Sequence, residues 1–396
     1  MLHDFLPNRV SYWKSSHVEN VFHISYEQFG SEMSEILQKI PKMKKISNQQ
    51  KKHIEILKDT NFGPGLTKGV YNYPKTKRLL DDALLELETS FTPTVDSGLP
   101  SSMRARIHGW IWEYISVLGE YLDTTFEKAK THTDHAKDGS DHLCKKPFIC
   151  EEAYSKIISA FAAMCGLRVK KGTTDNQAMW ENLRGMDKVV ISKPDFRFHC
   201  TGEDSSIHNN FVTITEVKTE TQLTITEQFK RKRQDSERRA KRRHFNVSNS
   251  FSSSSTPLES DEHTCHLNEG GKSFPSKTGS AMPMIEVDVG EHTLGQHAGE
   301  LLLDLHTYME QHTDVQKPSI LTMPGMIIDK TMVYLTLLEI SHQHYEKLAG
   351  TEQLTGEDRA TIYYYEPYDI FEEQEREILI NAFIKLNNME SIEVIK

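Results

Sequence analysis

Two short stretches of the sequence place acidic and basic side chains where they could act on the same group. Asp195 follows Pro194 in VVISKPDFRFHC, and Glu216 and Lys218 lie two residues apart in FVTITEVKTE. In an extended strand, residues two apart point to the same face, roughly 6.6 Å apart along the chain. Glu216 and Lys218 therefore project together, and pairing of the two segments would bring Asp195 beside Glu216. Because Pro194 has no N–H to donate, it marks a strand edge or a bulge, which can redirect the next side chain.

This combination of side chains predicts a particular chemistry. Two carboxylates that converge from adjacent strands offer the oxygen ligands that Mg²⁺ or Mn²⁺ prefers. A neighbouring ammonium can orient a water molecule or stabilise developing negative charge, and the reaction that uses both features is metal-assisted phosphodiester hydrolysis. The alternative is a solvated strand face on which Glu216 and Lys218 form a surface ion pair that contributes little to stability. The β-branched residues of this segment favour a buried strand and disfavour that alternative.

The motif resembles that of the PD-(D/E)XK phosphodiesterase superfamily, whose members share the restriction-endonuclease-like fold. Pro194-Asp195 is the single Pro-Asp of the chain, and after a spacer of 20 residues Glu216-Val217-Lys218 is its single acidic-x-Lys triplet. The resemblance covers roughly 150–221 and 291–340 and implies an αβββαβ core. It also implies that Asp195 and Glu216 are metal ligands, that the Val217 carbonyl is a third ligand, and that Lys218 positions the attacking water.

The resemblance implies two further site residues. Many members carry an acidic residue on the first core helix, where this chain has both Glu151 and Glu152. Some members carry a glutamine on the helix that follows the last motif strand, where this chain has Gln296. A long insert separates that helix from the motif strand, and the insert departs from the family pattern.

The elements around the motif are expected in an order that suits such a core. Apolar periodicity predicts a helix over 150–165, ended by Gly166, and a strand that begins at Leu167–Val169. The motif segments 189–200 and 211–220 read as an antiparallel pair. The later elements are a helix over 291–311, strands over 319–328 and 332–341 with Asp329-Lys330 as the turn, a strand over 360–368, and a final helix with Asp369 and Glu372 at capping-box spacing.

These elements predict an α/β fold, a restriction-endonuclease-like mixed sheet with flanking helices. A helical N-terminal region is expected over 1–135, with helical spacing over 24–60, broken at Pro41, and over 76–88 and 101–130. The nuclease-like core is expected over 150–396. A disordered insert, first basic and then rich in Ser, Gly and Pro, is expected over 222–290.

Composition narrows the classes of protein that fit. The chain has 47 basic and 57 acidic residues, so its net charge of −10 excludes a wholly basic nucleic-acid coat. Its five cysteines form no even framework and no CxxC pair, which favours a reduced, intracellular compartment. The N-terminus lacks the apolar core of a signal peptide, and no run is long enough to span a bilayer. We expect an intracellular protein without a membrane segment.

A basic run lies inside the expected insert. Between Lys230 and Arg243 there are nine basic and two acidic residues, which leaves a net charge of −17 on the rest of the chain. The run is typical of a bipartite nuclear-localisation signal, read by a nuclear import receptor, or of a nucleic-acid-binding arm. A solvated charge run is the alternative.

His132, His135, His142 and Cys144 loosely suit a zinc site, but a polar linker is the better interpretation.

The sequence therefore predicts a Mg²⁺- or Mn²⁺-dependent nuclease of the nucleus that hydrolyses phosphodiester bonds of DNA or RNA. The alternative function is a catalytically inactive nuclease-fold nuclear protein that binds nucleic acid or a protein partner through its basic insert. Sequence alone does not distinguish DNA from RNA as the substrate or an endonuclease from an exonuclease, and it does not give the oligomeric state.

Overall fold

The structure, a computed structural model, describes residues 6–30, 33–40, 43, 45–62, 73–90, 99–136, 151–172, 177–186, 188–200, 211–218, 283–311, 318–350 and 352–388. The chain divides into two units, and all described residues belong to the unit formed by 1–219 and 283–396. The other unit, 220–282, contains the predicted basic run and lies outside the described residues.

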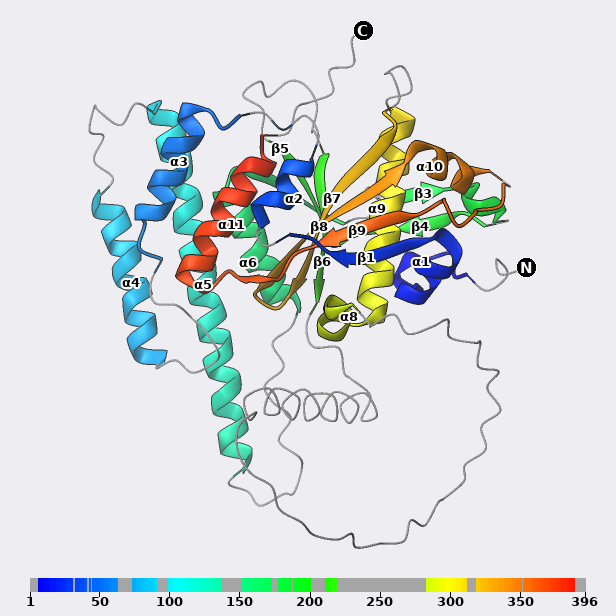
Figure 1. Cartoon of the computed structure of the whole chain (residues 1–396). Coiled ribbons are helices and arrows are strands. Elements are labelled where there is room, and N and C mark those ends of the chain that lie inside the picture. Colours follow the sequence, from blue (N-terminus) through cyan, green and yellow to red (C-terminus); the bar gives the residue numbers. More distant parts are fainter. Residues whose placement is uncertain are drawn as a thin grey trace, which may run out of the picture. The chain divides into compact units, whose positions relative to one another are not determined.

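A mixed β-sheet of eight strands forms the centre of the described unit (Figure 1). From one edge to the other its strands are β1 (Ile24–Gln28), β9 (Ala360–Tyr364), β8 (Met332–Ser341), β7 (Ile320–Asp329), β6 (Phe211–Lys218), β5 (Phe196–Cys200) and β2 (Leu167–Lys171). The short β10 (Tyr368–Asp369) pairs with β8. The pairs β1–β9 and β6–β7 are parallel, and the other pairs are antiparallel.

Helices cover both faces of the sheet (Figure 1). Side chains alternate between two cores along each central strand, so that Met326 and Ile328 face one core and Ile327 faces the other. The helices of the first core are α2 (Met33–Lys39), α3 (Asn48–Asp59), α4 (Tyr73–Ser90), α5 (Ser101–Ala136), α6 (Glu151–Met164) and α11 (Glu373–Leu386). Those of the second core are α1 (Ser15–Phe22), α8 (Met284–Val289), α9 (Glu291–Gln311) and α10 (His342–Ala349).

Two short turns of 3₁₀ helix and a separate hairpin complete the described structure. The 3₁₀ turns are η2 (Val10–Tyr12) and η5 (Leu183–Gly185), and the two-stranded sheet consists of β3 (Ala178–Trp180) and β4 (Val190–Ser192). The expected mixed α/β fold with flanking helices is confirmed at this level.

Helix α9 is the crossover between the parallel strands β6 and β7, as a parallel pair requires. Its buried leucines 301, 302 and 303 hold it on the sheet. At Gly325 on β7 an added Cβ would lie 2.7 Å from Cε1 of His297, so only glycine lets the helix approach this closely. At the end of α6, Gly166 adopts φ +85°, which turns the chain into β2.

Several predicted elements are confirmed. The helices expected at 76–88, 101–130, 150–165 and 291–311 are α4, α5, α6 and α9, and the strands expected at 211–220, 319–328 and 332–341 are β6, β7 and β8. The hairpin turn between β7 and β8 lies at Lys330-Thr331, one residue later than predicted, because Asp329 still pairs with Met332. Lys330 adopts φ +61° in this turn.

The helical interpretation of 24–60 is wrong at its start, where β1 forms the edge of the main sheet beside β9. Ile24 and Tyr26 are buried while their neighbour Glu27 is exposed, a period of two that only five residues carry. Because this strand belongs to the main sheet, the region 1–135 is not helical throughout.

The segment 189–200 contains two strands rather than one. Strand β4 ends at Ser192 and pairs with β3, whereas β5 begins at Phe196 and pairs with β2 and β6. Pro194 lies between them, where it cannot supply a ladder hydrogen bond. The prediction of a strand edge at Pro194 is therefore confirmed, and the continuous strand is wrong.

Two further expectations are corrected. The insert expected to reach residue 290 ends earlier, because α8 is ordered and buries Ile285 and Val289 in the second core. The capping box expected at Asp369 and Glu372 is absent, because α11 begins after Glu372 with no side-chain cap. Asp369 instead accepts a hydrogen bond from the Phe371 N–H, 2.9 Å away, in the preceding turn.

Candidate active site

The pairing of β5 with β6 brings Asp195 and Glu216 together. Phe196 lies opposite Thr215 in the antiparallel register, so the residues one step further out, Asp195 and Glu216, are also neighbours. The Val217 N–H donates to Oδ2 of Asp195 over 2.8 Å, and the Gly172 N–H donates to the Asp195 carbonyl over 2.8 Å. Asp195 is thus held from both β6 and the end of β2.

Lys218 forms an ion pair with Glu216 on the same face of β6. The Glu216 side chain is fully buried, whereas a quarter of the Lys218 side chain is exposed. Burial raises the pKa of Glu216, the charge of Asp195 raises it further, and Lys218 opposes both. Burial lowers the pKa of Lys218, but the carboxyl groups of Glu216 and Asp195 outweigh burial, so Lys218 stays a cation at neutral pH.

Asp195 is itself partly buried. Burial raises its pKa, while the hydrogen bond from Val217 and the charges of Lys218 and Lys193 oppose that shift. Asp195 is therefore a carboxylate whose charge depends on neighbouring cations.

Of the two glutamates expected on the first core helix, Glu151 faces the motif. Partial burial raises the pKa of Glu151, the charge of Asp195 adds to that shift, and Lys218 opposes it. Glu152 makes no hydrogen bond or ion pair with any described residue. Glu151, in the first turn of α6, is therefore the glutamate within electrostatic reach of Asp195 and Lys218.

Glu300 is a neighbour of Glu216 that the sequence reasoning missed. It lies on α9 and is fully buried, and the Gln296 side-chain amide donates to its Oε1 over 2.9 Å. Gln296 is therefore brought to the site through Glu300, in spite of the long insert. The spacing Gln296-x-x-x-Glu300 on one helix face was the available signal, together with a carboxyl group inside the apolar run GELLLDL.

We refer to Glu151, Asp195, Glu216 and Glu300, together with Lys218, as the carboxylate cluster. Burial raises the pKa of Glu300, and the charge of Glu216 raises it further. If both glutamates were ionised, Oε2 of each would be buried without a hydrogen-bond donor from any described residue. A proton on Glu300 allows it to donate to Glu216. The pair therefore needs either a proton or a cation between its carboxyl groups.

A buried ion pair fixes β5 against α9 next to the cluster. Arg197 on β5 pairs with Oδ1 of Asp304 at 2.9 Å, and both side chains are buried. Burial raises the pKa of Asp304 to about 6, although the Arg197 charge opposes this. Because Arg197 and Asp195 are two residues apart on the same stretch of chain, this pair sets the position of the strand that follows Asp195.

The donor set of the cluster suits a hard divalent cation. Its side chains offer carboxylate oxygens and no sulfur or imidazole ligand, which favours Mg²⁺ or Mn²⁺ over zinc or copper. As the described side chains stand, no three among the His, Cys, Asp and Glu residues are arranged to hold a metal ion. The Lys218 ammonium lies against Glu216 and compensates part of its charge.

Other predicted site residues lie outside what the structure describes. The side chains of His132, His135, His142 and Cys144 and the run Lys230–Arg243 fall there. No helix in the described ranges is long and apolar enough to cross a membrane. No known protein family matches the chain, and neither does any curated protein.

Proposed function

We propose that the chain is a divalent-metal-dependent nuclease that hydrolyses phosphodiester bonds of DNA or RNA. The observation that carries the proposal is the register of β5 and β6, which sets Asp195 beside Glu216 with Lys218 on the same face. The order α6, β2, β5, β6, α9, β7 supports it, because it is the αβββαβ order of the superfamily that the motif resembles, with the β3–β4 hairpin as an addition.

The residues of the carboxylate cluster have separate roles in this proposal. Asp195, Glu216 and the Val217 carbonyl would hold Mg²⁺ or Mn²⁺. A bound ion would supply Lewis-acid stabilisation of the phosphate and a more acidic water. Glu300, held by Gln296, fixes the buried carboxyl of Glu216 in place.

Lys218 acts as a hydrogen-bond donor. Its ammonium carries three N–H groups, of which the ion pair with Glu216 engages one. Lys218 would orient the attacking water or bind a non-bridging phosphate oxygen if a bound divalent ion neutralised Glu216. Glu151, at the exposed rim, can accept a hydrogen bond from that water.

One observation favours a second candidate function, a nuclease-fold nuclear protein without catalysis that binds nucleic acid or a protein partner through its basic insert. In the structure Lys218 is paired with Glu216, and a degenerate site would retain the same ion pair.

Cleavage assays with the full-length chain separate the two functions. Plasmid DNA, single-stranded DNA and RNA are incubated with Mg²⁺, Mn²⁺ or EDTA. We expect cleavage with either metal ion, and its loss in Asp195→Asn and Glu216→Gln, while the exposed control Glu357→Gln retains it. Metal binding is measured independently by titration calorimetry with Mn²⁺, and both site variants should weaken it at least ten-fold.

Two outcomes decide against catalysis. The first is an absence of cleavage of all three substrates by a folded chain, and the second is cleavage that survives in both site variants. If Mn²⁺ binds normally but no substrate is cleaved, the second function is the better description.

A further inference from the structure

Strand β2 is an edge of the main sheet, and on one side of its backbone it pairs with no described strand. The Gly172 N–H, directly after β2, donates to the Asp195 carbonyl, so these two residues form a hydrogen-bonded pair of the antiparallel ladder. Because such pairs alternate along a ladder, the backbone groups of Lys170 face β5, whereas those of Val169 and Lys171 face outward. The outer edge of β2 thus offers backbone donors and acceptors to an added strand.

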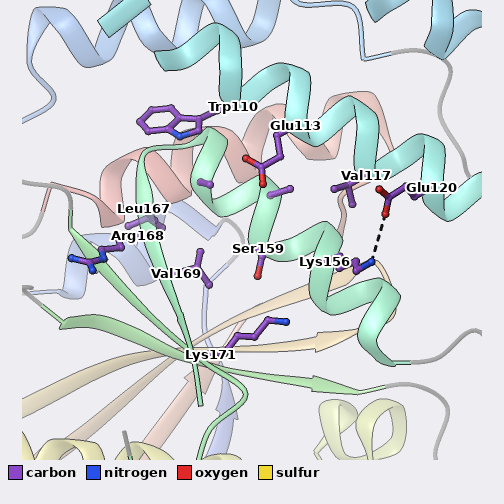
Figure 2. A pocket seen from close by; sticks show the side chains of 12 residues that line it. Trp110, Glu113, Val117, Glu120, Lys156, Ser159, Leu167, Arg168, Val169 and Lys171 are labelled. Carbon is purple, nitrogen blue, oxygen red and sulfur yellow. Dashed lines mark ion pairs between the residues drawn. The ribbon is translucent and has the colours of Figure 1, made fainter. Parts of the chain in front are cut away.

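A groove of about 630 Å³ borders this strand, between β2, α5 and α6 (Figure 2). Its apolar lining consists of Trp110, Val117, Ala160, Ala163, Leu167 and Val169. Its charged side chains balance, because Glu113 and Glu120 on α5 stand against Lys156 and Lys171. Arg168 points away from the groove (Figure 2). The groove therefore suits apolar side chains and attracts neither sign of charge.

The opposite face of β2 is positive. Arg168 and Lys170 alternate along the strand with the three residues whose side chains face the groove. Burial lowers the pKa of Lys170, and the charges of Arg168 and Arg197 lower it further. An acidic side chain on this face would relieve that repulsion. A strand added to β2 would thus meet an apolar groove on one face and positive charge on the other.

The chain that follows α11 is placed to reach this edge. The Cys200 thiol, at the end of β5 that lies beside the start of β2, donates to the Leu386 carbonyl at 3.6 Å. An added Cβ at Gly166 would lie 2.9 Å from Nδ2 of Asn387, so α11 ends beside the first residue of β2. The segment 389–396 comes next and lies outside the described residues. Its eight residues extend over roughly 26 Å, against roughly 13 Å for β2.

The sequence of this segment, Met-Glu-Ser-Ile-Glu-Val-Ile-Lys, suits both faces of β2. Ile392 and Val394 are β-branched, which favours a strand, and residues two apart share one face of a strand. Glu393 lies between them and belongs to the opposite face. If Ile392 and Val394 cover the groove, Glu393 falls on the face that carries Arg168 and Lys170.

We propose that residues 389–396 add a strand to the outer edge of β2, with Ile392 and Val394 over the groove. The added strand is parallel to β2, because the segment leaves α11 at the start of β2 and runs toward its end. Antiparallel pairing of β2 with the β2 of a second copy is disfavoured, because it would set the cations of Leu-Arg-Val-Lys-Lys against one another.

Exchange of backbone amide protons, followed by NMR on the full-length chain with isotope-labelled valine and lysine, tests the added strand. The N–H of Val169 faces the outer edge, whereas the N–H of Lys170 faces β5 and is the internal reference. Both amides should be protected in wild type. Replacement of Ile392 and Val394 together by aspartate should speed exchange at Val169 by about ten-fold or more and leave Lys170 unchanged.

Two further variants separate this contact from a general loss of stability. Ile395→Asp is the matched control, because residue 395 belongs to the face opposite to Ile392 and Val394, and it should keep wild-type exchange at Val169. Glu393→Lys should speed exchange at Val169, because it sets a cation beside Arg168 and Lys170. The addition of Lys170→Glu to that variant should slow the exchange again, which a merely unfolded segment would not do.

Three outcomes would overturn the proposal. The first is wild-type exchange at Val169 in the variant with aspartate at 392 and 394, because the segment then does not protect the edge. The second is an equal acceleration in Ile395→Asp. The third is protection of Val169 that rises with the concentration of the chain, which would assign the edge to a second copy.

Discussion

At the scale of single residues, the burial of Glu216 governs the behaviour of the carboxylate cluster. A fully buried carboxyl with Asp195 beside it and Glu300 against it can ionise only if a cation compensates. Lys218 supplies one such charge in the described arrangement. The cluster is thus under electrostatic strain that a divalent ion would relieve, which is a reason to expect metal affinity rather than a role in stability.

Replacement of Glu300 by glutamine tests this view through stability in EDTA. Burial and the Glu216 charge raise the folded-state pKa of Glu300 above its ordinary 4.5. The folded state therefore holds a proton that the unfolded state releases, and stability is lost as pH rises from 4.5 through the folded-state pKa. The side-chain amide of the variant can donate to Glu216 at every pH. We expect Glu300→Gln to raise the free energy of unfolding by about 1–2 kcal/mol at pH 8.

The gain in free energy of unfolding from Glu300→Gln should be smaller at pH 5, because wild-type Glu300 is protonated there and can itself donate to Glu216. Urea unfolding at both pH values measures it, with the exposed Glu357→Gln as control. A loss of stability at pH 8, or an equal gain at both values, would show that the two carboxyl groups do not repel each other.

At this scale, the sequence predicts a contact between side chains only where the spacing of the residues along the chain determines it. Asp195, Glu216 and Lys218 were predictable because a period of two and one strand pairing determine their positions. Glu300 was not, because its contact with Glu216 depends on how α9 rotates over the sheet. That rotation is set by packing such as the approach of His297 to Gly325, which no local pattern reveals.

At the scale of elements, α9 connects the site to the rest of the fold. One face of this helix carries Gln296, Glu300 and Asp304 at intervals of four residues, and these reach Glu216 on β6 and Arg197 on β5. His297, on the adjoining part of the helix, bonds Thr336 Oγ1 at 2.8 Å. The helix therefore holds the two motif strands in register as well as covering the sheet.

A methyl group at Gly325 should disturb this helix. The new Cβ would lie 2.7 Å from both Cε1 of His297 and Oγ1 of Thr336, and neither group is at the end of a flexible side chain. We expect Gly325→Ala to reduce the free energy of unfolding by about 1–3 kcal/mol, the usual cost of overpacking. Gly109→Ala on α5 is the control, since its Cβ would meet nothing within 4 Å, and it should stabilise by up to about 1 kcal/mol. Chemical denaturation compares the two, and equal effects would exclude close packing at Gly325.

The contact between α3 and α6 should make the first core sensitive to acid. Burial lowers the pKa of His53 on α3 to about 4, although its hydrogen bond to the Met164 carbonyl, at 2.9 Å, opposes the shift. Below pH 6.5 the His53 side chain is protonated in the unfolded state but stays neutral in the folded state. The free energy of unfolding therefore falls as pH falls from 6.5 toward 4. This residue alone should account for up to about 3 kcal/mol of that loss.

His53→Gln should flatten that part of the pH dependence, since its amide can still donate to the Met164 carbonyl without titrating. The matched control is His292→Gln, which replaces an exposed histidine. Unfolding free energies at pH 7 and pH 4.5 provide the comparison. A wild-type slope in His53→Gln would assign the acid sensitivity to other groups.

Elements were predictable where their periodicity extended over many residues, as in α5, α6, α9, β7 and β8. Strand β1 was not predictable, because its five alternating residues lie at the start of a longer segment whose apolar spacing is helical. Helix α8 was not, because six amphipathic residues adjoin a polar segment without periodicity.

At the scale of the whole molecule, the described unit is a sheet covered by helices on both faces, and the basic run lies in the other unit. Removal of 230–243 leaves 38 basic and 55 acidic residues, a net charge of −17. A chain with this net charge repels polyanions at long range. The basic run is therefore expected to supply most of the non-specific affinity for nucleic acid.

Deletion of 221–281 tests whether the basic run, rather than the described unit, supplies the affinity for nucleic acid. The deletion ends before α8, because Ile285 and Val289 of that helix belong to the second core. Helix α9 crosses back along β6 to start the parallel strand β7, so the end of β6 and the start of α8 lie at the same end of the sheet, and a short Gly/Ser linker should join them. The deleted chain should fold with a melting temperature close to that of wild type. Loss of nine cations should reduce the slope of log K against log salt on duplex DNA by up to about 8.

The same deletion should abolish nuclear accumulation of a tagged chain. A full-length variant with the nine basic residues of 230–243 replaced by glutamine is the control, because it removes charge without shortening the chain. If the deleted chain is insoluble and the glutamine variant is not, the segment is structural. If both remain nuclear with an unchanged salt slope, the run is a solvated charge segment, and the affinity for nucleic acid must come from the described unit.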